Sequence, residues 1–327
     1  MRDRNEYFEN PALLFIDTAD AIREKTGETG LIDAVDYPEK IKKIETTFDY
    51  SNNEIISVGD YAYQGMSNLK SVYMPNAQSI GDYAFALCDH LTRIELSNSL
   101  SSIGDSAFAW CYKLTDIYIP DSVQNIGNSA FSNCKKLTNV TIPQNITSID
   151  DYVFGWSGLE YIEIPDNIIS IGYMAFYNCE NLKSITISDN VENIGEQAFA
   201  RCTLLESIIV NENNINYSSD DSNVLYDKEK TTLLQFPIAN PITEYTIANG
   251  TQSILSDAFG GCENLQKISM PISITSIGEY AITCRNLTDI IYDGTVDQWN
   301  LITFADGWDM DTPTYTIHCT DGDIVKS

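Results

Sequence analysis

Histidine is almost absent from this sequence: only His90 and His318 occur among its 327 residues. General acid–base and triad chemistry usually requires a histidine or a carboxylate pair that is held in a pocket. Neither histidine stands beside a nucleophile motif, and no Cys-x-x-Cys pair provides ligands for a metal ion. We therefore expect a protein that is not an enzyme and that carries no metal ion or other cofactor.

Positive charge is also scarce. The chain has 19 lysines and arginines against 47 aspartates and glutamates, which gives a formal net charge of −28. Such a surface repels nucleic-acid phosphates and anionic bilayers. We expect neither nucleic acid nor anionic membrane among its partners.

Long apolar runs are missing as well. No run approaches the length of about 20 residues that spans a bilayer, and the polar start at Met1 is not followed by the apolar core of a signal peptide. We expect no transmembrane segment. Either a leader is missing from the start of this sequence, or export follows another route.

What the sequence does contain is a repeat of about 23 residues between Val58 and Ile277, a period typical of stacked solenoids. One copy comprises Ile103-Gly104, Ala107-Phe108, Cys111, Leu114, Ile117 and Ile119-Pro120. The leucine-x-x-isoleucine-x-isoleucine spacing predicts a turn that leads into a short strand with inward apolar residues. A single copy buries too little apolar area to fold alone, so the copies must stack.

A second part of each copy predicts one helical turn, for example Asn128 to Phe131, with a small polar residue at its start. Polar residues recur at this register position: Asp60, Asp82, Asp105, Asn128 and Asp151. Helix capping explains this row, and the alternative is a ladder of cation ligands.

Seven of the eight cysteines share one repeat position, which favours small, buried core residues with free thiols over disulfides. They are Cys88, Cys111, Cys134, Cys179, Cys202, Cys262 and Cys284, and Cys319 stands apart.

The repeat register is interrupted between about residues 211 and 253. Asn223 to Asp227 and Leu233 to Phe236 predict two strands of a hairpin around the turn at 227–230. We expect an enlarged copy that projects from the solenoid, either as a binding loop or as solvated extra residues.

The Ile-Gly, Ala-Phe, Cys, Leu, Ile and Ile-Pro positions together resemble the BspA-type leucine-rich repeat family. The match covers about two thirds of the chain, although Ser157-Gly158 replaces one cysteine region and Ile282 replaces one phenylalanine. The resemblance implies a bacterial surface or secreted adhesion protein that binds host or matrix components. It therefore implies a location at the cell surface or outside the cell.

The predicted fold is thus a leucine-rich repeat solenoid of short parallel strands and single helical turns, with a cap at each end. Residues 1–47 predict a helical N-terminal module, 48–292 the solenoid, and 293–327 a compact C-terminal cap. The N-terminal stretch also resembles a module of some phage and prophage structural proteins. In the cap, Trp299, Phe304 and Trp308 are expected to cover the last coil, and the alternative is that the tryptophans stack on a sugar.

The outward row of the strands is the candidate binding surface, because strands hold side chains at regular spacing. Exposed tyrosines beside carboxylates suit a protein or carbohydrate ligand on a surface, although strand propensity alone also favours tyrosine. The candidate ligand-binding residues are Tyr73, Arg93, Glu95, Asp116, Tyr118, Tyr161 and Glu163. We expect a non-catalytic adhesion or recognition protein; the alternative is a structural assembly component, docked through residues 1–47 into a phage-tail-like or cell-surface structure.

Overall fold

The computed structural model describes residues 48–51 and 55–326. The chain forms two compact units, which divide between Ile146 and Thr147. The expected N-terminal helices, and the stretch that resembles a phage module, lie outside the described residues. The boundaries after residues 47 and 292 remain predictions.

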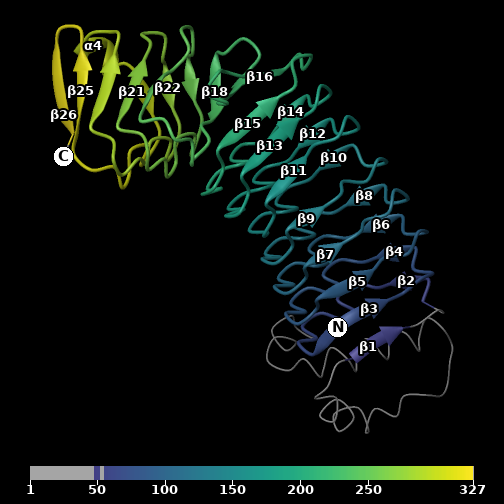
Figure 1. The fold of residues 1–327 in the computed structure, drawn as a ribbon. Coiled ribbons are helices and arrows are strands. Elements are labelled where there is room, and N and C mark those ends of the chain that lie inside the picture. Colours follow the sequence, from purple (N-terminus) through teal and green to yellow (C-terminus); the bar gives the residue numbers. More distant parts are fainter. Residues whose placement is uncertain (1–47, 52–54, 327) are drawn as a thin grey trace. The chain divides into compact units, whose positions relative to one another are not determined.

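Unit 1 is a stack of coils that supply strands to two parallel sheets (Figure 1). In the smaller sheet, Ile80 pairs with Ile103 and Ile103 pairs with Ile126, so each coil sets the same register position above its neighbour. The five-stranded sheet contains β1 (Phe48–Ser51), β3 (Leu69–Tyr73), β5 (Arg93–Glu95), β7 (Asp116–Ile117) and β9 (Asn139–Val140). The four-stranded sheet contains β2 (Ser57–Val58), β4 (Ser79–Ile80), β6 (Ser102–Ile103) and β8 (Asn125–Ile126).

Unit 2 continues the same coil pattern in four sheets (Figure 1). Two three-stranded sheets contain β10 (Ser148–Ile149), β12 (Ser170–Ile171) and β14 (Asn193–Ile194), and β11 (Tyr161–Glu163), β13 (Ser184–Ile187) and β15 (Ser207–Val210). The six-stranded sheet contains β16 (Tyr217–Ser219), β17 (Leu225–Asp227), β18 (Thr232–Gln235), β20 (Ser253–Ile254), β22 (Ser276–Ile277) and β24 (Thr303–Phe304). The five-stranded sheet contains β19 (Glu244–Thr246), β21 (Lys267–Met270), β23 (Asp289–Tyr292), β25 (Tyr315–Cys319) and β26 (Gly322–Lys326). The prediction of a solenoid of short, mainly parallel strands is confirmed.

The segment that precedes each core cysteine is not the helical turn that the sequence predicts. Tyr83 and Leu87 have positive φ angles of 55° and 62°, and the same two positions are left-handed in most coils. As a result, the N–H of Tyr83 donates to the carbonyl of Asp105 in the next coil, and that of Leu87 donates to Ala109, both at 2.8 Å. These bonds run between coils, whereas a helix bonds within its own chain segment. The prediction of helical turns is therefore wrong.

The polar row at the start of these turns consequently has a different role from helix capping. Asp82 accepts the N–H of Asp105 on the next coil at 2.8 Å, and Asp105 accepts that of Asn128 at 2.7 Å. The coils approach so closely here that a Cβ on Gly104 would lie 2.5 Å from Asp82 Oδ1. The row joins successive coils, and the capping interpretation is wrong.

The core consists of repeated layers of the same side chains. The rings of Phe85, Phe108 and Phe131 stack with centroids 5.4 Å apart, and all three are fully buried. The thiol of Cys111 donates to the carbonyl of Phe85 at 3.2 Å. The prediction of a row of buried, free thiols is confirmed. Burial raises the pKa of the Cys134 thiol to about 12.

The interruption at 211–253 forms a hairpin that lies within the sheet. β17 and β18 are antiparallel, and β18 then pairs in parallel with β20, where the regular coils resume. Val224, Tyr226 and Phe236 are buried, and the hydroxyl groups of Tyr226 and Tyr245 lie 2.7 Å apart. The expectation that this segment projects from the solenoid is wrong, because its apolar side chains continue the core.

The C-terminal segment covers the last coil. Helix α4 (Val296–Trp299) begins with a capping box of Thr295 and Gln298. The rings of Trp299, Phe304 and Trp308 lie 4.7–6.2 Å apart, and the tryptophans are only 4% and 7% exposed. They fill the end of the core, so stacking of these rings on a sugar is excluded. The antiparallel pair β25 and β26 ends the sheet.

Candidate functional site

The outward row of the five-stranded sheet in unit 1 carries most of the predicted binding residues. Arg93 and Glu95 on β5 are exposed and flank the buried Ile94, as the alternation of a strand requires. Tyr73 on β3 is 44% exposed, and Tyr118, just after β7, is 63% exposed. The sequence therefore predicted correctly which side chains of these strands face solvent.

The parallel register brings these residues into neighbouring positions. Tyr73 pairs with Glu95, and Arg93 pairs with Asp116. Arg93 Nη2 also lies 2.5 Å from Glu95 Oε1 on the same strand. Because both side chains are largely exposed, this ion pair contributes about 0–1 kcal/mol to stability. The guanidinium group remains accessible to a ligand at low energetic cost.

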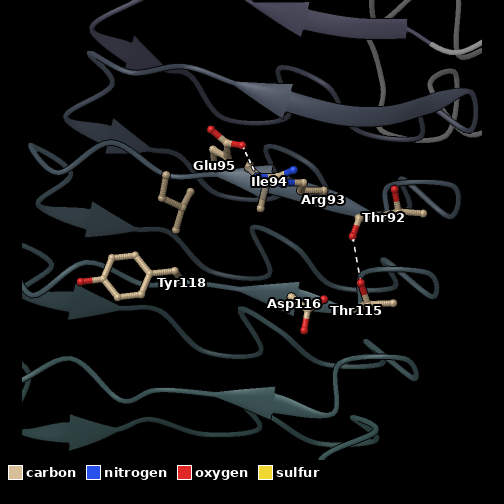
Figure 2. Close-up of a pocket in the computed structure, with 8 residues that line it drawn as sticks. Thr92, Arg93, Ile94, Glu95, Thr115, Asp116 and Tyr118 are labelled. Carbon is tan, nitrogen blue, oxygen red and sulfur yellow. Dashed lines mark hydrogen bonds and ion pairs between the residues drawn. The ribbon is translucent and has the colours of Figure 1, made fainter.

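A shallow, open depression of about 640 Å³ lies over these strands (Figure 2). Figure 2 shows Arg93 and Glu95 on one strand, Asp116 on the next strand, and Tyr118 nearby. The depression offers an aromatic face, a cation and two carboxylates, which suit hydrogen bonding and ring packing. Its lining residues are Thr92, Arg93, Ile94, Glu95, Leu96, Thr115, Asp116 and Tyr118.

Thr92 and Thr115 are part of this depression but were not among the predicted residues. Each directly follows the inward leucine of its copy, and the hydroxyl of Thr115 donates to the carbonyl of Thr92 at 3.4 Å. The sequence contains a signal that could have identified them, because a threonine follows the inward leucine in both of these successive copies.

Tyr161 and Glu163 lie on β11 of unit 2, so the structure groups them apart from the other predicted residues. Tyr161 is 53% exposed, and the Lys183 ammonium lies 5.4 Å from its ring centroid. Lys183 also lies 3.8 Å from Glu160. On this unit, the outward row thus presents a tyrosine with a cation over its ring.

Among residues 48–51 and 55–326, no group of three or more histidine, cysteine, aspartate or glutamate side chains is arranged to hold a metal ion. In the same residues, no helix has the length and apolar character needed to cross a membrane.

The family comparison finds one repeat family along most of the chain. A model described as the BspA type leucine rich repeat region, in 6 copies, matches residues 39–159, 147–237 and 235–319. A comparison with curated proteins gives no match.

Similar solved structures are also leucine-rich repeat proteins of bacteria. A leucine rich cell surface protein from Faecalibacterium prausnitzii is 32% identical, with a TM-score of 0.67 over 75% of this chain and 71% of that one. A leucine-rich repeat protein from Eubacterium ventriosum is 25% identical, with a TM-score of 0.57 over 71% of this chain and 73% of that one. The repeats and the fold are therefore shared with these proteins.

Proposed function

Because the chain belongs to the BspA-type leucine-rich repeat family, we propose that it is a non-catalytic recognition or adhesion protein that acts at the cell surface or outside the cell. The similar Faecalibacterium protein is itself described as a cell surface protein, which supports this location. The ligand is a protein or a carbohydrate that is presented on another surface.

One observation carries this proposal: a stacked parallel sheet holds solvent-exposed tyrosines next to charged side chains. Tyr73 and Tyr118 are far more exposed than the buried aromatic residues of the core. The backbone of Tyr73 is held by pairing with Glu95 on the next coil, and Tyr118 directly follows Ile117, which pairs with Val140. An exposed ring on a rigid strand loses little conformational entropy when it binds, because its backbone is already ordered. Such residues are typical anchors of recognition surfaces.

The chemistry of the row indicates what kind of ligand it recognises. Arg93 can donate to carbonyl or carboxylate groups, and Asp116 can accept from hydroxyl or amine groups. The tyrosines add apolar area and a hydrogen-bonding hydroxyl. With a net charge of −28, the protein favours neutral or basic partners over anionic ones.

The test is binding of the intact chain to arrays of glycans and extracellular-matrix proteins. Tyr73, Tyr118 and Tyr161 are changed together to serine, which keeps the strands but removes the rings. Tyr112→Ser is the matched control, because Tyr112 is also exposed (39%) but does not belong to the outward row. We expect a specific ligand that is lost in the triple variant and retained in the control.

A ligand that binds both variants equally would refute the outward row as the binding surface. Deletion of residues 1–47 addresses the assembly alternative. Recognition by the solenoid predicts that ligand binding survives the deletion. The assembly alternative predicts that self-association, or docking into a larger structure, is lost on the deletion.

A further inference from the structure

The turn side of unit 2 carries a cluster of aromatic side chains that the strand row does not include. We call Tyr152, Trp156, Tyr173 and Tyr177 the turn-face cluster. Tyr152 is nearly parallel to Trp156, with centroids 6.2 Å apart, and meets Tyr173 edge-on at 5.4 Å. Trp156 in turn meets Tyr177 at 5.1 Å. All four rings are partly exposed, so the cluster forms a connected aromatic surface.

Two of these residues depart from the repeat where the fold requires no aromatic ring. Tyr177 occupies the position held by the buried alanines Ala86 and Ala109 in unit 1, directly before the second left-handed residue. Tyr173 occupies the position of Asp82 and lacks the carboxylate by which Asp82 bonds the next coil. Neither aromatic ring is required for stacking, since other coils stack with aspartate or alanine at these positions, which points to an additional role at the surface.

Polar side chains at one border of the cluster are held in place by a buried carboxylate. The hydroxyl of Tyr173 donates to Gln197 Oε1 at 3.1 Å, and the Arg201 guanidinium lies 5.8 Å from the Tyr177 ring. Gln197 Nε2 donates to Asp257 Oδ2, and Arg201 Nε lies 3.7 Å from Asp257 Oδ1. The Asp257 side chain is only 3% exposed. Because this carboxylate holds both the Gln197 and the Arg201 side chain, the border of the cluster is preorganised for a ligand.

Asp257 belongs to a coil that lies beyond the irregular segment 211–253. Its hydrogen bond with Gln197 therefore joins residues that are 60 positions apart in the sequence, on either side of this irregular segment. Burial raises the pKa of the Asp257 carboxyl, while its bonds to Gln197 and Arg201 oppose that rise. The irregular coil thus brings together side chains that an uninterrupted repeat would keep apart.

From this arrangement we propose that the turn-face cluster is a binding site for neutral carbohydrate. The C–H faces of a sugar ring pack on the negative face of an aromatic ring, and sugar hydroxyl groups bond to amide, guanidinium and carboxylate groups. The exposed carboxylates of Asp151 and Glu196 near Tyr173 accept hydroxyl donors but repel an acidic sugar. Four rings offer far less than the roughly 800 Å² that each partner contributes to a standard protein interface. A glycan fits this area better than a protein does.

The test titrates the intact chain with maltohexaose, cellohexaose, xylohexaose and chitohexaose, with hyaluronan as an anionic comparison. Binding is followed by calorimetry and by tryptophan fluorescence, with sugar concentrations up to about 10 mM because a site built on a few ring contacts gives millimolar affinity. The variant is Tyr173→Asp with Tyr177→Ala, which restores the residues of other coils and so preserves folding. Tyr83→Ser is the control, since Ser106 and Ser129 hold the same register position.

We expect at least one neutral hexasaccharide to bind, and the double variant to weaken that binding by about tenfold or more. The Tyr83→Ser control should bind the sugar as the native chain does. The triple serine variant of the strand row should also retain sugar binding, so failure of this site can be distinguished from failure of the proposed function. The inference is overturned if none of the four sugars binds, if hyaluronan binds better than they do, or if the double variant binds as the native chain does. It is also overturned if the double variant loses binding to a protein ligand while its binding of the sugars is unchanged.

Discussion

The close stacking of coils at the glycine positions leads to a sharp prediction about Gly104. A Cβ at this position would lie 2.5 Å from Asp82 Oδ1, 2.6 Å from Asp82 N and 2.6 Å from the carbonyl carbon of Gly81. Two of these atoms belong to the backbone, so the coils must separate to make room. We therefore expect Gly104→Ala to destabilise unit 1 strongly.

The magnitude follows from the contacts that such a separation disturbs. Overpacking of a well-packed site costs about 1–3 kcal/mol. The N–H of Gly104 donates to Ile80 O at 2.8 Å, and the N–H of Asp105 donates to Asp82 Oδ1 at 2.8 Å. Weakening of both bonds adds about 0.5–1.5 kcal/mol for each. The free energy of unfolding should fall by about 2–6 kcal/mol.

Gly155→Ala is the matched control, because the atoms nearest to its added Cβ lie 3.5 Å away. Other coils carry Ala86 and Ala109 at this register position. We expect this variant to be unchanged or about 0.4–1 kcal/mol more stable, since alanine restricts the unfolded chain. Urea denaturation followed by far-UV circular dichroism gives the midpoints. Equal midpoints for the two variants would refute the argument that the coils are in close contact at Gly104.

Three further predictions concern the core and the C-terminal segment. A thiol reagent should label Cys319 in the native protein, at a rate that increases with pH because burial and the nearby Asp321 raise the pKa of its thiol. The seven buried cysteines should react only on unfolding, and labelling of several thiols in the folded chain would contradict the buried row. Hydrogen bonds to Asp289 and then Asp323 raise the pKa of His318 above its usual value of 6.5. The native chain should therefore have a higher melting temperature than the His318→Gln variant. The full difference should be present at pH values below 6.5, and it should shrink as the pH rises through the raised pKa of the folded state. A difference that does not change with pH would exclude the ion pairs as its cause. Trp299→Ala should lower the free energy of unfolding by about 3–5 kcal/mol, as measured by urea denaturation, because it opens a cavity in the C-terminal core.

Much of the fold could be predicted from the sequence because the same pattern recurs at a constant spacing. The period of about 23 residues and the alternation around Ile94 and Ile117 determine which side chains face inward. The shared position of the cysteines likewise identifies them as core residues. The exposure of Tyr73 and Tyr118 follows from the same alternation. Each of these properties depends on the position of a residue within its own copy.

The tertiary structure decided the features that depend on bonds between copies. Left-handed residues such as Tyr83 turn their N–H groups toward the next coil, and a local pattern of small and polar residues does not distinguish this from a helical turn. The hairpin at 225–235 joins the sheet because its second strand, β18, pairs with β20 of the following coil. Asp257 meets Gln197 for the same reason, since only the stacked coils bring residues 60 positions apart into contact. The sequence by itself thus determined the composition of each coil, whereas the stacking of the coils decided how their turns bond and which surface side chains lie together.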